Sequence, residues 1–297
     1  MHEASIDARV TGKTRIMGVL GNPVEHSISP QIHNTISNLL GVNAIYIPLK
    51  SNINNLEDTI KGLKAINVAG FNITIPFKEK VMQYLDECSQ EARLIGAVNT
   101  VVNKNGRLIG YNTDAEGFSK SFEEAFGKSF KSARIMVLGA GGAARAVAVK
   151  AAMQGADTIN IVNRTSWKAA EIASLINNHF ECKAEAVGFE NIKQRNLLEK
   201  TDVIINTTPI GMYPDIDNSP VSVENNFSEK HIVYDLIYNP PETKLLKHAK
   251  KCGARTLNGL GMLLRQAILA YELITGISVP DDVSSTVITL FENYFFN

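Results

Sequence analysis

The chain has 297 residues, enough for about two domains of ordinary size. Its 30 basic and 30 acidic side chains cancel, so the overall charge favours neither nucleic acid nor an anionic membrane surface as a partner. Cys88, Cys182 and Cys252 lie far apart and in no metal-binding spacing, which indicates reduced thiols and no metal site. Neither a signal peptide nor a membrane-spanning apolar run is recognisable, and we expect a cytoplasmic protein.

The N-terminal part of the chain alternates between expected strands and helices. Strands are expected at 15–20, 43–49 and 69–75, followed by a hairpin of 97–102 and 107–111. A helix is expected to begin at Ser29-Pro30, with Ser29 as its cap, and to end at Gly41. Further helices are expected at 56–63 and 79–88. This alternation predicts an α/β domain with a mainly parallel sheet.

A glycine-rich turn lies in the middle of the chain. The apolar run Ile135–Leu138 has the length of a strand, and Gly139, Gly141 and Ala144 match the pattern G-x-G-x-x-G/A. An Ala-rich helical stretch follows directly. Glycines at these positions allow a tight turn and a close approach to a pyrophosphate, which the helix N-terminus attracts. The turn therefore predicts a dinucleotide-binding domain, with a separate domain before it.

The elements after the turn complete this second domain. Strands are expected at 158–162, 184–188, 202–206 and 231–236, the order of the Rossmann-type, doubly wound fold. Two helices, 262–274 and 283–294, follow it, and we expect them to return to the first domain. The predicted boundaries are 1–113 plus 259–297 for a substrate domain and 114–258 for the dinucleotide domain.

The end of the strand at 158–162 indicates which dinucleotide binds. NAD-binding folds carry a carboxylate there, which bonds the ribose 2′-hydroxyl. This chain has Asn163-Arg164-Thr165 instead, with Lys168 one turn later and no acidic residue before Glu171. Such side chains would bind a 2′-phosphate, which a carboxylate would repel. The pattern favours NADP, although Arg164 and Lys168 would also be ordinary as surface charges.

Several polar side chains stand where the neighbouring residues predict apolar or turn positions. Ser27 and Ser29 lie at a helix N-terminus, where paired hydroxyls and free N–H groups can bind a carboxylate or a phosphate. The others lie in strands, at strand ends or in an apolar helix; they are Thr74, Lys78, Asn99, Asp114 and Gln266. Taken singly, each has an ordinary alternative, such as a helix cap for Ser29 or Asp114 and a surface lysine for Lys78.

Together with the glycine turn, these segments resemble the shikimate dehydrogenase family along nearly the whole chain. The motifs appear in the family's order and at its spacing: GNPVEHSISP, NITIPFK, GAVNT, NTDAEGF, LGAGGAARA, VNRT, NTTPIGM, YDLIYNP and NGLGMLLRQA. The resemblance implies NADP-dependent interconversion of 3-dehydroshikimate and shikimate in aromatic amino-acid biosynthesis. One departure is Lys168, where many members carry an arginine that binds phosphate in a bidentate manner.

The resemblance also implies roles for individual residues. Lys78 and Asp114 would form the catalytic pair, although the sequence leaves open which of them accepts the proton. Substrate would be held by Ser27, Ser29, Thr74, Asn99, Tyr238 and Gln266. NADP would be held by Gly139, Ala140, Gly141, Gly142, Ala143, Asn163, Arg164, Thr165, Lys168, Gly259 and Met262.

Two other functions stay open. A quinate/shikimate dehydrogenase with relaxed use of NAD and NADP would share the fold and most of these residues. A non-catalytic NADP-binding regulator would not need Lys78 and Asp114, so their presence argues against it. In every case the expected partners are small molecules rather than nucleic acid or membrane, and the expected assembly is a monomer or homodimer.

Overall fold

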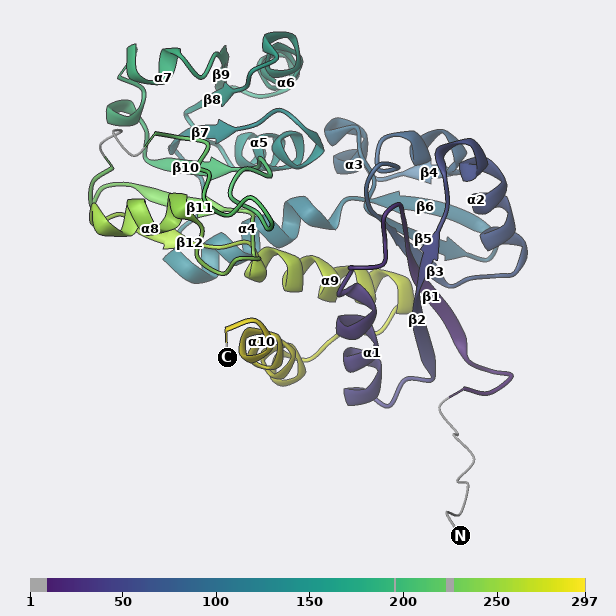
Figure 1. The fold of residues 1–297 in the computed structure, drawn as a ribbon. Helices are drawn as coiled ribbons and strands as arrows, with labels where there is room; N and C mark the ends of the chain where they lie inside the picture. The colour runs from purple at the N-terminus through teal and green to yellow at the C-terminus, as the bar shows by residue number, and fades with distance from the viewer. Residues whose placement is uncertain (1–9, 195, 223–226, 297) are drawn as a thin grey trace. The chain divides into compact units, whose positions relative to one another are not determined.

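The computed structural model describes residues 10–194, 196–222 and 227–296 (Figure 1). Residue contacts divide the chain into two compact units. The first unit comprises the chain up to Thr113 together with Ala267–Phe291, and the second comprises Asp114–Gln266 together with the residues from Glu292 onward. Both units combine helices with a six-stranded sheet, so the predicted α/β class is confirmed.

The first unit has a mixed, parallel-rich sheet in the strand order β2-β1-β3-β5-β6-β4. β1 pairs in parallel with β2 and β3, and β4 pairs in parallel with β6, whereas β5 runs antiparallel to β3 and β6. The strands are β1 (Arg15–Gly21), β2 (Ala44–Lys50), β3 (Gly70–Ile73), β4 (Glu87–Cys88), β5 (Thr100–Lys104) and β6 (Arg107–Tyr111). The predicted hairpin is confirmed: Asn105 and Gly106 turn it with φ of 53° and 83°, as a two-residue hairpin turn requires.

Two segments distant in sequence complete the first unit. Its own helices are α1 (Ser29–Leu39), α2 (Leu56–Ala65) and α3 (Gln90–Ile95), with the 3₁₀ turns η1 (Ile53–Asn55) and η2 (Lys80–Tyr84). Most of α9 (Leu260–Thr275) and of α10 (Asp281–Phe296) also belongs to it. The Arg15 guanidinium donates to the carbonyl oxygens of Ile274 and Thr275, each at 3.1 Å. The predicted return of the C-terminal helices to the first domain is therefore confirmed.

The second unit has an entirely parallel sheet in the order β12-β11-β10-β7-β8-β9. Counted from β7, this is the strand order of dinucleotide-binding folds. Its strands are β7 (Arg134–Leu138), β8 (Thr158–Val162), β9 (Lys183–Val187), β10 (Val203–Asn206), β11 (Ile232–Asp235) and β12 (Arg255–Leu257). Its helical elements are α4 (Thr113–Phe126), α5 (Gly142–Met153), α6 (Ser166–His179), α7 (Asn191–Gln194), η3 (Leu198–Lys200) and α8 (Lys244–Lys251).

The apolar strands of this second sheet are buried on both faces. Ile135 and Val137 of β7 pack into the core beneath α5 and α6, while Met136 and Leu138 pack into the core beneath α8. Continuous apolar runs, rather than alternating ones, are what a sheet covered on both faces requires. This explains why β7 and its neighbours were recognisable from the sequence.

Three local predictions are wrong, and one short strand was missed. Ser29 does not cap α1; Ile28 occupies the cap position, and no side chain caps the helix there. β3 ends at Ile73, before Thr74, because its ladder to β1 stops there and a turn follows, with the Phe77 N–H donating to the Thr74 carbonyl. Residues 79–88 form η2 and β4 instead of one helix, because Glu87 and Cys88 pair with β6. The short strand β12 was not predicted.

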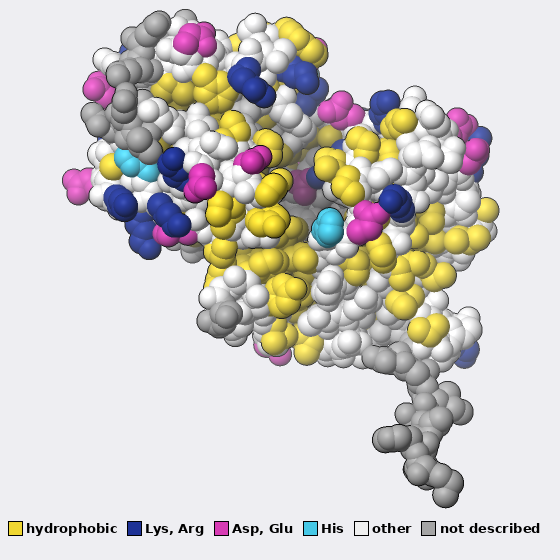
Figure 2. Space-filling view, in the orientation of Figure 1, with side chains coloured by type: hydrophobic (Ala, Val, Ile, Leu, Met, Phe, Trp, Pro, Cys, Tyr) yellow, Lys and Arg dark blue, Asp and Glu magenta, His cyan; other side chains and the backbone are white. Residues whose placement is uncertain are grey.

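Charged side chains of both signs occur on the face shown in Figure 2, in keeping with the net charge of zero. Basic side chains gather over α8, whose last turn contains His248, Lys250 and Lys251. Positive charge at a helix C-terminus is favoured by the helix dipole. Within the described ranges, no helix is both long enough and apolar enough to cross a bilayer.

Candidate active site

In the first unit, four of the predicted site residues follow strands β1 and β3. The strands are parallel, so the segments after them leave the sheet at the same edge, where ligands collect in α/β folds. Ser27 and Ser29 are half-buried, and the Ser27 hydroxyl accepts from the Ser29 N–H at 3.3 Å. Thr74 packs against the end of β1, since a Cβ built on Gly21 would lie 2.2 Å from the Thr74 methyl group. Lys78 is half-buried, and its carbonyl oxygen accepts from the Val98 N–H at 2.8 Å.

A buried network of amides and hydroxyls holds Asn99. The Asn99 side chain donates to the Thr113 hydroxyl at 3.0 Å and accepts from the Thr113 N–H at 2.7 Å. Asn72 donates to the Asn99 carbonyl and to the Thr100 hydroxyl, both at 3.0 Å, and accepts from the Tyr46 hydroxyl at 2.8 Å. A polar group buried in this way must be hydrogen-bonded, and these bonds fix the orientation of Asn99. Because Thr113 begins α4, the network also fixes the helix turn that carries Asp114.

Tyr238 and Gln266 belong to the second unit. Tyr238 follows β11, its ring meets that of Phe295 edge-on at 5.4 Å, and burial raises the pKa of its hydroxyl. Gln266 is buried in α9 and donates to the Leu263 carbonyl at 2.9 Å. Asp114 lies in the first turn of α4, where a carboxylate is favoured by the helix dipole.

The glycine turn has the geometry that a pyrophosphate requires. Gly139 has a φ of 109°, and a Cβ there would lie 2.6 Å from the Thr207 hydroxyl oxygen, so only glycine fits. Gly141 is the cap residue of α5 and provides no side-chain cap, and a Cβ on Gly141 or Gly142 would meet nothing within 4 Å. The N-terminus of α5 therefore opens onto free space with no side-chain acceptor from its cap residue, which suits a bound anion.

Two further segments carry predicted cofactor residues. Asn163 after β8 donates to the Thr165 carbonyl at 3.0 Å, while Arg164, Thr165 and Lys168 are exposed beside it. This loop leaves its cations accessible to a 2′-phosphate, and the residues present fit NADP. Elsewhere in the unit, Gly259 packs so closely on the Leu236 carbonyl that a Cβ would lie 1.9 Å from its oxygen. Met262 packs against the core beneath α5 and α6.

The sequence reading missed a buried carboxylate in the second unit. Asp235 ends β11 with no exposed surface and accepts hydrogen bonds from Asn206, Ile237 and Thr243. Burial raises the pKa of Asp235 from 3.8 to about 6. The signal was available in the run IVYD, since an acidic residue that ends a buried apolar strand needs a polar partner.

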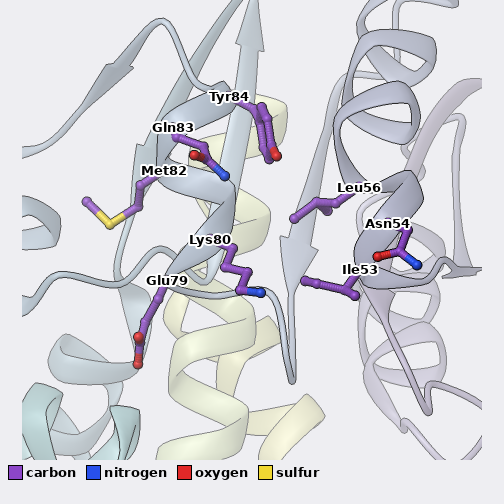
Figure 3. Close-up of a pocket in the computed structure, with 8 residues that line it drawn as sticks. All are labelled: Ile53, Asn54, Leu56, Glu79, Lys80, Met82, Gln83 and Tyr84. Atoms are coloured by element: carbon purple, nitrogen blue, oxygen red, sulfur yellow. The ribbon is translucent and has the colours of Figure 1, made fainter.

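Two hollows lie on the surface of the first unit. One of about 610 Å³ is lined by residues of η1, α2 and the segment Glu79–Tyr84, and the side chains of Lys80 and Ile53 face each other across it (Figure 3). A second, of about 290 Å³, lies beside the ends of β1 and β2 and is lined by Asn22, Lys50, Ser51, Asn52, Asn55 and Thr59. Neither lining includes a predicted site residue. Within the described ranges, no cluster of three acidic, histidine or cysteine side chains could hold a metal ion.

The sequence matches models of two protein families. Residues 19–101 match the shikimate dehydrogenase substrate-binding domain, and residues 121–236 match shikimate/quinate 5-dehydrogenase. A curated NADP⁺ shikimate dehydrogenase from Desulforamulus reducens is 44% identical over 282 residues, covering 94% of this chain and 96% of the relative. The chain belongs to the shikimate dehydrogenase family.

Solved structures of the shikimate dehydrogenase family share the fold as well. A shikimate dehydrogenase in complex with NADP⁺ aligns with a TM-score of 0.87 and 43% identity, over 95% of this chain and 97% of the other. A quinate dehydrogenase from Corynebacterium glutamicum in complex with NAD aligns with a TM-score of 0.85 and 30% identity, over 94% and 99%. The family predicted from the motifs is confirmed.

Proposed function

We propose that this chain catalyses the NADP-dependent, reversible reduction of 3-dehydroshikimate to shikimate in the biosynthesis of aromatic amino acids. The main support is that the chain is 44% identical to an NADP⁺ shikimate dehydrogenase over nearly its whole length and carries the family's motif residues, with Lys168 as the one departure noted. The presence of both Lys78 and Asp114 favours an enzyme over a non-catalytic regulator.

The substrate carboxylate would bind to Ser27 and Ser29, with Tyr238 assisting. The two hydroxyls would supply the donors, because Pro30 has no N–H and the Ser29 N–H already donates to the Ser27 hydroxyl. The ring hydroxyls would bind to Thr74, Asn99 and Gln266. The bonds to Thr113 and Asn72 orient Asn99 in advance, which lowers the entropy cost of binding.

In the direction of reduction, the carbonyl oxygen of the substrate gains negative charge as the carbon is reduced. NADPH, when bound, supplies the hydride. Lys78 would donate a proton to that oxygen, and in the reverse direction it would accept the proton from the hydroxyl. A positioned acid or base of this kind contributes about 10²–10⁴ in rate. Asp114 would orient the Lys78 ammonium group and bind a neighbouring hydroxyl of the substrate.

The second unit would hold the cofactor. Gly139, Ala140, Gly141, Gly142 and Ala143 would meet the pyrophosphate at the start of α5. Asn163, Arg164, Thr165 and Lys168 would hold the 2′-phosphate and adenosine, while Gly259 and Met262 would border the nicotinamide. We assign 114–258 to this cofactor domain and 1–113 with 259–297 to the substrate domain, in a cytoplasmic monomer or homodimer.

Relaxed specificity for quinate and NAD is the second candidate, because a quinate dehydrogenase solved with NAD shares the fold. Steady-state kinetics with shikimate and quinate, each with NADP and NAD, distinguish the two. We expect the highest kcat/KM for shikimate with NADP. Comparable values for quinate with NAD would establish the second candidate, and no turnover of either substrate would refute both.

A further inference from the structure

Strands β10 and β11 end side by side in two buried polar residues that the proposed chemistry does not use. Asn206 and Asp235 are paired in register, and neither has exposed surface. The Asn206 amide donates to one carboxylate oxygen of Asp235 at 2.9 Å, and the Ile237 N–H donates to the same oxygen at 3.1 Å. The Thr243 hydroxyl donates to the other oxygen at 2.6 Å. A buried carboxylate is costly unless it is bonded in this way, so its retention calls for an explanation.

From Asn206 the network reaches the glycine turn. The side-chain amide oxygen of Asn206 accepts two hydrogen bonds from Thr208, one from its N–H at 3.0 Å and one from its hydroxyl at 2.7 Å. The preceding residue, Thr207, donates its N–H and its hydroxyl to the Leu138 carbonyl at 2.9 and 2.7 Å. Its hydroxyl lies against Gly139, where a Cβ would clash at 2.6 Å. The Thr207-Thr208 segment, which Asn206 holds, therefore packs directly against the glycine turn.

From Asp235 the network reaches Gly259. The Asp235 carboxylate accepts a hydrogen bond from the Ile237 N–H, and the Ile237 carbonyl accepts one from the Gly259 N–H at 3.0 Å. The Leu236 N–H donates to the backbone carbonyl of Asn206 at 2.9 Å, and the Leu236 carbonyl packs on Gly259. The segment that carries Gly259 is thus fixed to the same two strand ends as the glycine turn.

We propose that Asp235, Asn206 and Thr243 form a positioning network that holds the glycine turn and the Gly259 segment at the spacing that NADP requires. The proposal rests on the proposed assignment of these two segments to the cofactor. The three residues act through backbone that they orient, and they do not themselves touch the cofactor. Without the carboxylate, the two segments are held less firmly, and NADP binding weakens more than shikimate binding does.

Asp235→Asn tests the carboxylate with little change in shape. The affinity for NADPH, measured by its fluorescence, should fall about tenfold, the effect of losing one bond to a charged group. The KM for shikimate at saturating NADP⁺ should change less than about twofold, because the network is connected to the cofactor segments and not to the substrate residues. Circular dichroism and thermal unfolding show whether the variant is folded.

A pair of substitutions at Thr243 tests the same network without altering the charge. Thr243→Val removes the hydroxyl at nearly constant volume and should weaken NADPH binding severalfold, whereas Thr243→Ser keeps the hydroxyl and should restore the affinity. Thr201→Val is the matched control. Thr201 is equally buried, at 1% exposure, and its hydroxyl donates to the Leu197 carbonyl at 2.7 Å, next to the opposite end of β10. It should lower the melting temperature and leave NADPH affinity unchanged.

Folded Thr243→Val protein with the NADPH affinity of the wild type would overturn the proposal, even if Asp235→Asn failed to fold. An equal loss of affinity in Thr201→Val would also overturn it, since any buried hydroxyl would then have the same effect. If the wild type bound no NADPH, the cofactor assignment and the network would both be refuted. If Arg164→Asp weakened NADPH binding while the Asp235 and Thr243 variants did not, only the network would be refuted.

Discussion

At the scale of single residues, the proposed chemistry depends on one lysine whose backbone is fixed. The Lys78 carbonyl accepts the N–H of Val98, and the preceding Phe77 is fully buried. The side chain is half-buried, so a substrate oxygen near it would be shielded from water. An ammonium group in such surroundings stabilises developing negative charge more strongly than it does in bulk water.

Lys78→Ala should lower kcat by about 10²–10⁴, because the proton donor is lost. The affinity for NADPH should stay within about twofold, since Lys78 is assigned to the substrate and not to the cofactor. Lys80→Ala is the matched control: this exposed lysine lies two residues further on and lines the hollow beside η2. Near-normal turnover by Lys78→Ala in a steady-state assay would refute its assignment.

Arg164→Asp should reverse the preference between the two dinucleotides. The new carboxylate would repel the 2′-phosphate of NADP and could accept from the ribose 2′-hydroxyl of NAD. Loss of one charge-assisted bond alone should raise the KM for NADP by at least about tenfold. Arg107→Asp on β6 of the first unit is the control, and it should leave both KM values unchanged. An unaltered ratio of kcat/KM for NADP and NAD would contradict the role of Arg164.

At the scale of elements, the predictable strands are those whose apolar runs are buried on both faces. β7, β8, β10 and β11 were located within about a residue for this reason. The missed β12 is only three residues long, and its first residue is exposed. The two residues of β4 form a strand only because β6 lies beside them, which is a tertiary fact that the local sequence does not carry.

The contact between α4 and α9 shows a packing constraint that can be measured. A Cβ on Gly117 of α4 would lie 2.7 Å from the Gln266 N atom and 2.8 Å from the Met262 carbonyl oxygen. Since both are backbone atoms, the helices would have to move apart, and Gly117→Ala should destabilise the protein by about 1–3 kcal/mol.

Gly62→Ala in α2 provides the opposite control, because a Cβ there would meet nothing within 4 Å. That substitution should stabilise the protein by about 0.5–1 kcal/mol, through the helix propensity of alanine. Chemical denaturation of Gly117→Ala and Gly62→Ala measures the change in the free energy of unfolding for each variant. Equal effects of the two substitutions would show that close helix contact at Gly117 is not limiting.

At the scale of the whole molecule, the buried carboxylate makes stability depend on pH. The pKa of Asp235 rises from 3.8 to about 6 because burial disfavours its charged form. The unfolded chain therefore loses this proton first as the pH rises. The stability associated with Asp235 is fully present below its unfolded pKa and is lost as the pH rises through about 6.

The wild type should accordingly lose up to about 3 kcal/mol relative to Asp235→Asn as the pH rises from about 4 to 7. Groups with lowered pKa, such as Asp202 beside Arg134 and Asp86 beside Lys64, titrate alike in both proteins and cancel in the difference. Chemical denaturation of both proteins at several pH values measures this difference in the free energy of unfolding. A difference that stayed constant over this range would contradict the raised pKa.

The sequence by itself determined the family, the α/β class and the glycine turn, because these depend on short motifs and on apolar runs whose meaning is local. The tertiary structure decided which residues of these motifs contact one another and how they are oriented. It showed that Thr74 lies past the end of β3, that Ser29 is not a cap, and that Asn99 is oriented by Thr113. It also brought Asp235 beside Asn206 and Thr243, which are 29 and 8 residues away in sequence. Hydrogen bonds between such distant residues depend on how the strands align, and no local pattern records that alignment.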